Sequence, residues 1–317
     1  MNVVVMEGLT KYYGDLCAVD EFDLEVGNEI FGLLGPNGAG KSTIVKMLTT
    51  LIKPSKGRAF VCGHDVVKDP GGVRKCISYV PQEMAVDIKL TGRENVMLYA
   101  GLYHVKDRVK KVDQALSLMD LSDRADEPVR GYSGGMRRRL ELAQALVHEP
   151  SVLFLDEPTL GLDVAARKKI WSHISSLKQA GMTVFMTTHY MDEADRYCDR
   201  VAIIDRGRIA AIGTPDELKS EVGKKIITAR ISGPSPGLDL SGFHVLSRDD
   251  GEIRLSSGNG TESVSMISEA LNNQCREVVS MSVRDPTLDD VFLRKVTTRE
   301  EEGSFNGKKY RLMLRRR

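Results

Sequence analysis

Residues 35–43 read GPNGAGKST, and this glycine-rich stretch lies between the apolar run Ile30–Leu34 and the helical pattern STIVKMLTTL. Glycines let a loop curl so that successive backbone N–H groups face one anion, and the positive end of the following helix faces the same point. Strand, glycine-rich loop and helix, in that order, are the setting in which such a loop binds phosphate. The stretch therefore predicts a P-loop in an α/β domain.

All nine residues of this loop are candidates for nucleotide contact: Gly35, Pro36, Asn37, Gly38, Ala39, Gly40, Lys41, Ser42 and Thr43. Lys41 supplies a charge that can neutralise the β- and γ-phosphates, and the Ser42 hydroxyl suits a magnesium ion. A glycine-rich turn with a chance lysine is the alternative, and the flanking strand and helix argue against it. We expect the chain to bind ATP together with Mg²⁺.

Further apolar runs outline the sheet that carries the loop. Each is followed by a helical stretch, and they comprise residues 30–34, 78–80, 152–155, 183–187 and 201–205. Continuous apolar strands that alternate with helices are typical of a parallel sheet covered on both faces. Residues 91–149 have a helical pattern throughout, which predicts a helical subdomain inserted into the α/β domain.

A second, smaller domain is expected after a boundary near residues 220–225. Its sequence pattern predicts an α+β unit over 225–296, with strands at 226–231, 243–248, 252–255 and 278–283, a GPSPG loop and a helix at 262–273. The first domain then spans 1–220. Residues 297–317 are charged and carry few apolar positions, so we expect a flexible tail.

Polar residues follow two more of the apolar strands. Asp156 and Glu157 come directly after 152–155, and His189 follows the run MTVFMTT. Because the carboxyl ends of parallel strands meet at one edge of a sheet, we expect these side chains to lie near the P-loop. Asp156 is suited to hold magnesium, Glu157 to polarise an attacking water, and His189 to touch the γ-phosphate or that water. The alternatives are two acids that merely begin a loop and a structural histidine.

Ser133, Gly134 and Gly135, within GYSGGMRRRL, begin another helical pattern. A serine cap, backbone N–H groups left accessible by two glycines and the positive end of a helix predict a second anion-binding turn. A plain helix cap is the alternative. No aromatic residue is interleaved with the following Arg137–Arg139, so we interpret these arginines as a solvated helix face and not as a nucleic-acid surface.

Taken together, six ordered motifs resemble the nucleotide-binding domain of ABC ATPases over residues 3–220. They are GPNGAGKST, SYVPQE, YSGGM, VLFLDEP, the Gly161-Leu162-Asp163 turn and TTH. The resemblance implies that the Ser133–Gly135 turn closes over ATP held by a second subunit, so that a homodimer encloses two ATP molecules. Tyr132, Met136 and Val164 depart from the commonest family residues, Leu, Gln and Pro, but the Ser-Gly-Gly core is retained.

The resemblance also implies roles for three residues outside the phosphate loops. Tyr13 resembles the aromatic residue that stacks on adenine, with the neighbouring Tyr12 as the less favoured choice. Gln82 resembles the glutamine that contacts magnesium and the attacking water and that starts the link to the helical subdomain. Asp163 resembles the aspartate that reaches across the dimer. The expected catalytic set is therefore Glu157, His189 and Gln82.

Composition limits the classes of partner. The 317 residues include 45 Lys and Arg against 44 Asp and Glu, a net charge of +1, so phosphate recognition is local and no nucleic-acid partner is expected. The five cysteines lack CxxC spacing, which fits a reducing cytoplasm. The apolar runs are too short to cross a bilayer.

Three segments, LTGREN (90–95), YSGGMRRRL (132–140) and PTLDDVFL (286–293), resemble the ATP-binding subunits of drug and antibiotic exporters of the daunorubicin-resistance type. In that branch the transmembrane permease is a separate polypeptide, which implies peripheral association with the cytoplasmic face of the membrane. A soluble ABC ATPase acting on DNA or ribosomes is the alternative, and a nucleotide-dependent scaffold is a third possibility. The chain has a single P-loop and no sustained heptad repeat, which disfavours the ATPase acting on DNA or ribosomes. The presence of Glu157 and His189 disfavours the scaffold.

Two segments near the carboxyl end have open interpretations. PTLDDVFL, beyond its family resemblance, predicts a helix cap at Thr287 before a short amphipathic helix, with Asp289 and Asp290 near its positive end. The last ten residues, KKYRLMLRRR, contain six basic side chains, which either contact anionic lipid or the permease or form a solvated end.

Overall fold

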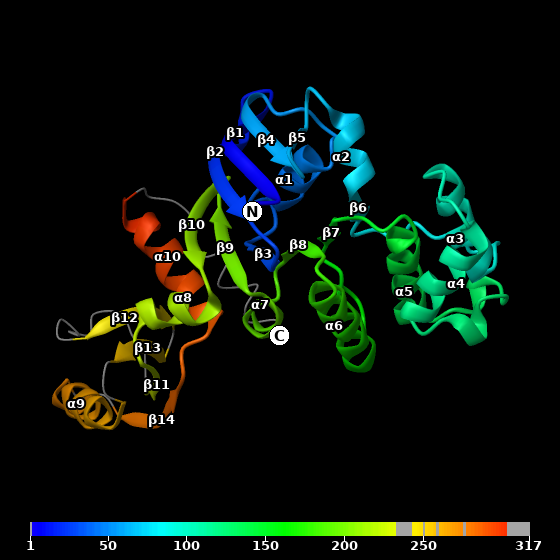
Figure 1. Cartoon of the computed structure of the whole chain (residues 1–317). Helices are drawn as coiled ribbons and strands as arrows, with labels where there is room; N and C mark the ends of the chain where they lie inside the picture. Colours follow the sequence, from blue (N-terminus) through cyan, green and yellow to red (C-terminus); the bar gives the residue numbers. More distant parts are fainter. Residues whose placement is uncertain (1, 233–242, 250, 258–259, 275–276, 303–317) are drawn as a thin grey trace. The chain divides into compact units, whose positions relative to one another are not determined.

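The structure is a computed structural model, and it describes residues 2–232, 243–249, 251–257, 260–274 and 277–302 (Figure 1). Contacts between residues divide the chain into two compact units, Met1–Ile209 and Ala210–Arg317. The GPSPG loop and the basic final ten residues lie outside the described residues. In the described part of the chain, no helix has the length and apolar character required to cross a membrane.

A six-stranded sheet, whose edge strand β10 (Arg208–Gly213) extends past the division at Ile209, forms the centre of the first unit and confirms the predicted α/β class. Its strand order is β10-β9-β3-β8-β7-β6, and the bounds are β3 Ile30–Leu34, β6 Ile77–Val80, β7 Val152–Asp156, β8 Thr183–Thr188, β9 Arg200–Asp205 and β10 Arg208–Gly213. The pairs β3–β8, β3–β9, β7–β8 and β6–β7 are parallel. Every residue of β3, β7 and β8 is buried, as expected for strands covered on both faces.

The register of the parallel strands brings their carboxyl ends to one edge. Leu34 of β3 pairs with Thr188 of β8, and Asp156 of β7 pairs with Thr187. The P-loop leaves β3, Glu157 follows β7 and His189 follows β8 at this edge. The fold therefore gathers segments that are more than a hundred residues apart in sequence.

An antiparallel sheet, which the sequence analysis did not identify, packs over the first. It has the order β2-β1-β4-β5, with bounds β1 Val4–Tyr13, β2 Leu16–Val26, β4 Lys56–Val61 and β5 His64–Asp65. Phe22 of this sheet shares one core with Phe31, Phe154 and Phe185 of the parallel sheet and with Ile44 of α1 (Lys41–Leu48). Burying each of these side chains contributes roughly 2 kcal/mol, so the core fixes the helix that carries the P-loop lysine.

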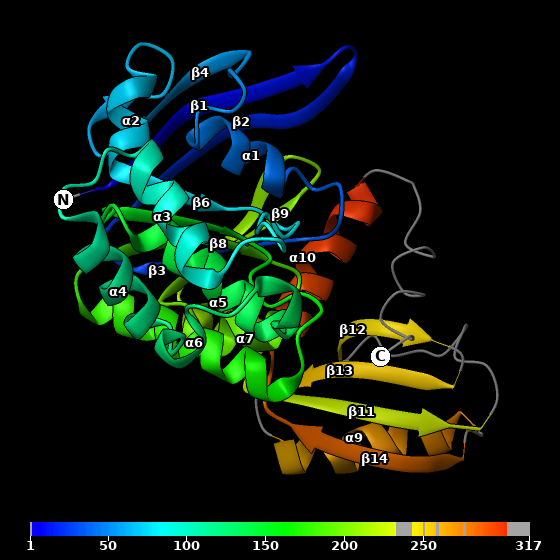
Figure 2. The same cartoon turned by 90° about the vertical axis from the view of Figure 1, so that its right-hand side faces the viewer.

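The region between residues 91 and 149 is helical, as predicted. It contains α3 Gly92–Leu102, α4 Arg108–Leu118, two short 3₁₀ turns at Ser122–Arg124 and Val129–Gly131, and α5 Gly134–Leu146. Thr91 and Glu94 form a reciprocal capping box at the start of α3. Figures 1 and 2 show these three helices grouped beside the six-stranded sheet. The remaining helices of the unit are α2 Pro70–Cys76, α6 Val164–Gln179 and α7 Met191–Tyr197.

The second unit is built on an antiparallel sheet of order β12-β13-β11-β14, as the predicted α+β class requires. The strands are β11 Lys225–Ile231, β12 His244–Asp249, β13 Glu252–Ser257 and β14 Val278–Arg284, and the helices are α8 Pro215–Val222, α9 Gly260–Asn273 and α10 Leu288–Glu302. Ile267 and Leu271 of α9 pack on Ile227, Ala229 and Leu255 of the sheet.

Two boundaries differ from those expected. The second unit begins at Ala210, before the expected boundary near 220–225, because α8 packs against α10 and so belongs to that unit. Helix α10 continues to Glu302, past the expected start of the tail at 297, and is longer than the short helix anticipated after Thr287. Once a helix has nucleated, each added residue gains a backbone hydrogen bond, and Arg and Glu are good helix formers. Residues 303–317 lie outside the described part.

Candidate active site

The P-loop follows β3 with a backbone that only glycine accommodates at Gly40. This residue has φ 106°, and a Cβ atom built on it would lie 2.5 Å from the carbonyl oxygen of Ala18. At Gly35, a Cβ atom would lie 2.4 Å from the carbonyl oxygen of Ile204. Close backbone approach on both sides therefore fixes the loop, and α1 begins immediately after Gly40. This arrangement presents the N-terminal end of α1 to a phosphate group.

Lys41 lies folded over the loop that precedes it. Its Nζ donates to the carbonyl oxygens of Gly35, at 2.6 Å, and Pro36, at 3.0 Å, and the residue is only 6% exposed. Burial lowers the pKa of the Lys41 ammonium, and the carboxylates of Glu157 and Asp156 oppose that shift. Phosphate oxygens, which carry charge, are stronger acceptors than these carbonyls, so the geometry suits Lys41 to bind a nucleotide.

Ser42 and Asp156 form a cluster of oxygen atoms beside the loop. Ser42 Oγ donates to Asp156 Oδ1 at 3.4 Å, and the Thr187 hydroxyl donates to the same oxygen. Asp156 is 4% exposed, at the end of β7. Hydroxyl and carboxylate oxygens are the ligands that Mg²⁺ prefers. The donor set therefore fits the expected magnesium ion.

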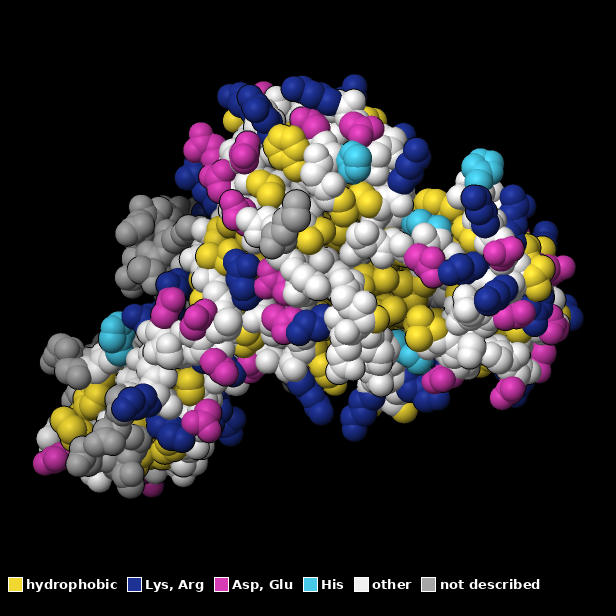
Figure 3. Space-filling view, in the orientation of Figure 1, with side chains coloured by type: hydrophobic (Ala, Val, Ile, Leu, Met, Phe, Trp, Pro, Cys, Tyr) yellow, Lys and Arg dark blue, Asp and Glu magenta, His cyan; other side chains and the backbone are white. Residues whose placement is uncertain are grey.

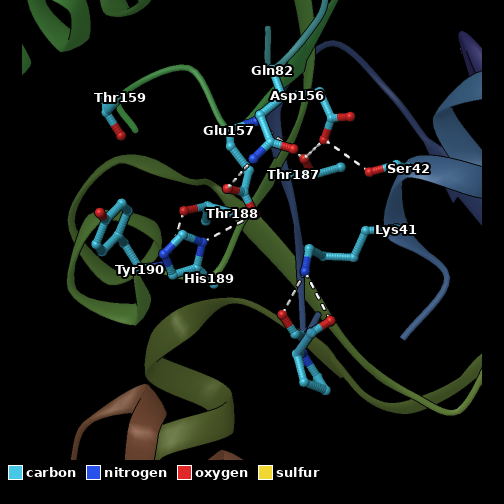
Figure 4. A network of polar contacts seen from close by, with 12 residues as sticks. Lys41, Ser42, Gln82, Asp156, Glu157, Thr159, Thr187, Thr188, His189 and Tyr190 are labelled. Atoms are coloured by element: carbon cyan, nitrogen blue, oxygen red, sulfur yellow. Dashed lines mark hydrogen bonds and ion pairs between the residues drawn. The ribbon is translucent and has the colours of Figure 1, made fainter. Parts of the chain in front are cut away.

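Glu157 is the centre of the polar network in Figure 4. Its Oε1 lies 3.0 Å from His189 Nδ1, and its Oε2 accepts from Gln82 Nε2 at 3.5 Å. The His189 hydrogen bond lowers the pKa of the Glu157 carboxyl, although burial opposes the shift. The carboxylate therefore stays ionised at neutral pH and can accept a hydrogen bond from water.

The backbone at Glu157 lies in the left-handed region, with φ 49°, which is unusual for a residue with a side chain. Its amide N–H donates to the carbonyl oxygen and to the hydroxyl oxygen of Thr187, at 3.1 and 3.2 Å. These bonds hold the chain in a conformation that costs of order 1–3 kcal/mol. Thr187 is not among the predicted site residues, and its signal in the sequence is a polar residue near the end of an apolar strand.

Ser133 and Asp163 occupy two neighbouring exposed turns. Ser133 Oγ accepts from the backbone N–H of Met136 at 3.2 Å, and Asp163 Oδ1 accepts from that of Ala166 at 2.9 Å. A Cβ atom on Gly135 would lie 2.7 Å from Ala166 Cβ, so the two turns are closely packed. Both side chains are therefore helix caps, and the exposed positive end of α5 remains accessible to an anion.

Tyr13 and Tyr12 lie at the exposed end of β1, where Tyr13 pairs with Leu16 of β2. Tyr13 is 48% exposed and Tyr12 39% exposed. The Lys11 ammonium lies 5.3 Å from the centre of the Tyr13 ring. The exposure of the Tyr13 ring is compatible with stacking on a planar base, and the assignment to Tyr13 stays a prediction.

The interpretation of Arg137–Arg139 as a solvated face is wrong. Arg138 is 3% exposed, Arg139 donates to the carbonyl oxygens of Met119 and Asp120, and Arg137 donates to that of Arg130. The bonding partners are backbone carbonyls, which the sequence does not mark. The available signal was the spacing of Arg138 three positions before Glu141, which puts opposite charges on one face of the helix.

Comparisons with known proteins agree with this geometry. A family described as ABC transporter matches residues 20–160, and one described as ATP-binding protein DrrA1-3-like, C-terminal domain, matches residues 213–296. The daunorubicin resistance ATP-binding protein DrrA3 of Streptomyces coeruleorubidus is 43% identical over 304 residues, which cover 92% of this chain and 95% of that protein. The daunorubicin/doxorubicin resistance ATP-binding protein DrrA of Streptomyces peucetius is 40% identical over 92% of each chain.

Solved structures match about two thirds of the chain. The protein cbiO1 from Clostridium perfringens, part of the transporter complex cbiONQ, has a TM-score of 0.64 at 29% identity and covers 69% of this chain and 91% of its own. A dimeric ATP-binding cassette bound to ADP and Pi has a TM-score of 0.60 at 25% identity, covering 67% of this chain and 98% of its own.

Proposed function

The chain belongs to the DrrA-like ATP-binding proteins of ABC transporters, and we propose how its residues bind and hydrolyse ATP. The chain is the ATP-hydrolysing subunit of an ABC exporter. The observation that carries the proposal is the network that joins Gln82, Glu157 and His189 beside the P-loop. It places an ionised carboxylate between two polar side chains at the edge where a γ-phosphate would lie.

Each side chain of the network has a distinct role in the proposed mechanism. Lys41 and the backbone N–H groups of the P-loop bind the phosphates, which positions the nucleotide. Glu157 accepts a hydrogen bond from the attacking water, and Gln82 orients that water. His189 holds the Glu157 carboxylate in place and contacts the γ-phosphate. Tyr13 stacks on adenine.

Mg²⁺ would be held by the Ser42 hydroxyl, the Asp156 carboxylate and the Gln82 amide oxygen. It supplies neutralisation of the negative charge that develops on the phosphates. The Thr187 hydroxyl bond keeps one Asp156 oxygen in a fixed position. Thr187 therefore orients this Asp156 oxygen before the nucleotide binds.

The complete site requires a second copy of the chain. Ser133 and Asp163 are exposed, and in the described residues no hydrogen bond or ion pair links either of them to Lys41 or Glu157. The dimeric arrangement of the similar cassette bound to ADP and Pi supports a homodimer. We assign the Ser133–Gly135 turn and Asp163 of each subunit to the ATP held by the other.

The transmembrane permease is proposed as a separate polypeptide that holds this subunit at the cytoplasmic face of the membrane. Apolar side chains are exposed after Gln82 and along α3: Met84, Ile88, Leu98, Leu102 and Tyr103. Figure 3 shows hydrophobic side chains gathered between the sheet and the α3–α5 helices. Such a patch suits an apolar partner surface. The names of the DrrA relatives, which refer to daunorubicin and doxorubicin resistance, support a drug as the exported substrate.

The two-subunit site can be tested by dilution. The ATP hydrolysis rate per chain is measured from nanomolar to micromolar protein at saturating Mg²⁺ and ATP, with Glu157→Gln protein as the background. Because each site needs two chains, we expect the rate per chain to rise with concentration and then reach a plateau. A rate per chain that stays constant while light scattering shows only monomers would exclude the shared site.

A further inference from the structure

Arg138 binds three backbone carbonyl groups that come from separate parts of the site. Its Nη1 donates to the Pro81 oxygen at 2.8 Å, its Nε to the Pro158 oxygen at 2.9 Å and its Nη2 to the Asp156 oxygen at 3.3 Å. The planar guanidinium fixes the directions of these bonds. One side chain of α5 therefore joins the loop that carries Gln82 to the end of the strand that carries Asp156.

Glu141, one turn later on α5, completes this contact. It is 4% exposed, its Oε2 accepts from Arg138 Nη1 at 2.9 Å, and its Oε1 accepts from the backbone N–H of Ala85 at 2.6 Å. The pair thus holds the Gln82 loop on both sides, at Pro81 and at Ala85. Each side-chain nitrogen of Arg138 and each carboxylate oxygen of Glu141 has a hydrogen-bond partner, as a buried charge requires.

We propose that Arg138 and Glu141 are positioning residues, which set the Gln82 amide relative to the Glu157 carboxylate and tie both to α5. The inference rests on the proposed role of Gln82 in orienting water. A buried ion pair is often no more stabilising than apolar residues of the same volume, so stability alone does not account for it. Because the Ser133–Gly135 turn begins α5, a shift of that turn is transmitted to Gln82 through Arg138.

A purely structural role makes a different prediction. If the pair only stabilises the fold, its loss lowers the melting temperature, and its effect on kcat multiplies with that of a Gln82 substitution. If the pair acts through Gln82, its loss has no further effect on kcat once the Gln82 amide is gone. A double-mutant cycle on kcat therefore separates the two roles.

The experiment uses the full chain with the substitutions Glu141→Ala, Gln82→Ala and both together. Steady-state kcat and KM for ATP are measured at saturating Mg²⁺, and the emission of the single tryptophan, Trp171, reports folding. We expect Glu141→Ala to lower kcat about tenfold with KM within about twofold, inside the ~100-fold that a 1 Å misplacement can cost. The double variant should be no slower than Gln82→Ala.

Glu141→Gln is the conservative variant. Its amide has one acceptor oxygen in place of two, so it can accept from Ala85 or from Arg138 but not from both, and we expect kcat between that of the parent and that of Glu141→Ala. Arg93→Gln, which removes the surface ion pairs of Arg93 in α3 with Asp113 and Asp126, is the matched control and should leave kcat unchanged. Arg138→Lys replaces Glu141→Ala if the latter does not fold, because an ammonium cannot reproduce the three directed bonds.

Three results would overturn the proposal. Multiplicative losses in the double variant would assign the pair to the fold alone and leave the role of Gln82 intact. Gln82→Ala protein that hydrolyses ATP at the parental rate would remove the proposed role of Gln82 and, with it, this inference. Failure of both Glu141→Ala and Arg138→Lys to fold would make the pair a folding determinant.

Discussion

His189 Nδ1 lies 3.0 Å from Glu157 Oε1, and this bond joins the ends of two parallel strands, β8 and β7. The bond favours the charged carboxylate, since it lowers the pKa of Glu157. A carboxylate that is ionised and held in one direction is suited to orient water, because it needs no reorganisation during the reaction. The pair therefore supports the assignment of Glu157 to the attacking water.

Glu157→Gln is expected to retain ATP binding and to reduce kcat by at least about 100-fold, within the range for loss of a positioned base. The amide keeps the size of the side chain, while it replaces one of the two acceptor oxygens and removes the charge that orients water. Because ATP is then not consumed, a closed homodimer should accumulate with Mg²⁺ and ATP. Size-exclusion chromatography and a phosphate-release assay measure the two effects, and parental turnover would rule out the assignment.

Lys41→Ala is expected to weaken ATP binding about 10- to 100-fold, since hydrogen bonds to charged groups contribute roughly 1.5–3 kcal/mol. Equilibrium binding of a fluorescent ATP analogue measures the change. Lys46→Ala is the matched control, because Lys46 is exposed on the same helix and lies outside the P-loop. Equal losses in the two variants would indicate a general charge effect and contradict a specific phosphate contact.

Ser133→Phe is expected to abolish hydrolysis while the monomer retains its ATP affinity, because the turn is assigned to the nucleotide of the other subunit. Ser133→Ala removes the helix cap without adding bulk to the turn, so it measures the contribution of the cap to stability. Loss of the Met136 hydrogen bond should cost about 1 kcal/mol of stability. Binding to the monomer is measured by titration in the dilute range. A comparable loss of monomer affinity in Ser133→Phe would contradict the two-subunit site.

The parallel sheet and the strand–loop–helix setting of the P-loop could be predicted from sequence, because apolar strands and the residues that follow them are local features. The antiparallel sheet could not. β1 pairs with β2 through several register shifts, between Met6 and Leu9 and again between Leu9 and Tyr12, and these shifts interrupt the alternation that marks a half-buried strand. The role of Arg138 was also hidden, because three of its four acceptors are backbone carbonyls brought together only in the folded chain.

Asp290 allows a prediction on stability as a function of pH in the second unit. The carboxylate is fully buried and forms two hydrogen bonds with the Arg284 guanidinium, at 2.6 and 2.7 Å. It also accepts from the backbone N–H and the hydroxyl of Thr287, so the Thr287 hydroxyl donates here and does not act as an accepting cap. Burial raises the pKa of Asp290, but the bonds from Arg284 and Thr287 outweigh burial and lower it overall.

Asp290→Asn should therefore destabilise the second unit by about 2 kcal/mol at pH 7, below the 3–5 kcal/mol of a fully buried pair, because Arg284 is 38% exposed. A lowered folded pKa gives stability that is present above the ordinary value of 3.8 and is lost as the pH falls through the folded pKa. The difference between parent and variant should be constant from pH 7 to 5 and shrink below about pH 4. Urea unfolding at each pH measures it. Asp285→Asn, which removes an exposed partner of Lys225, is the control and should change stability little. If the difference in unfolding free energy between the parent and Asp290→Asn shrinks between pH 7 and 5, the role of the ionised Asp290 is contradicted.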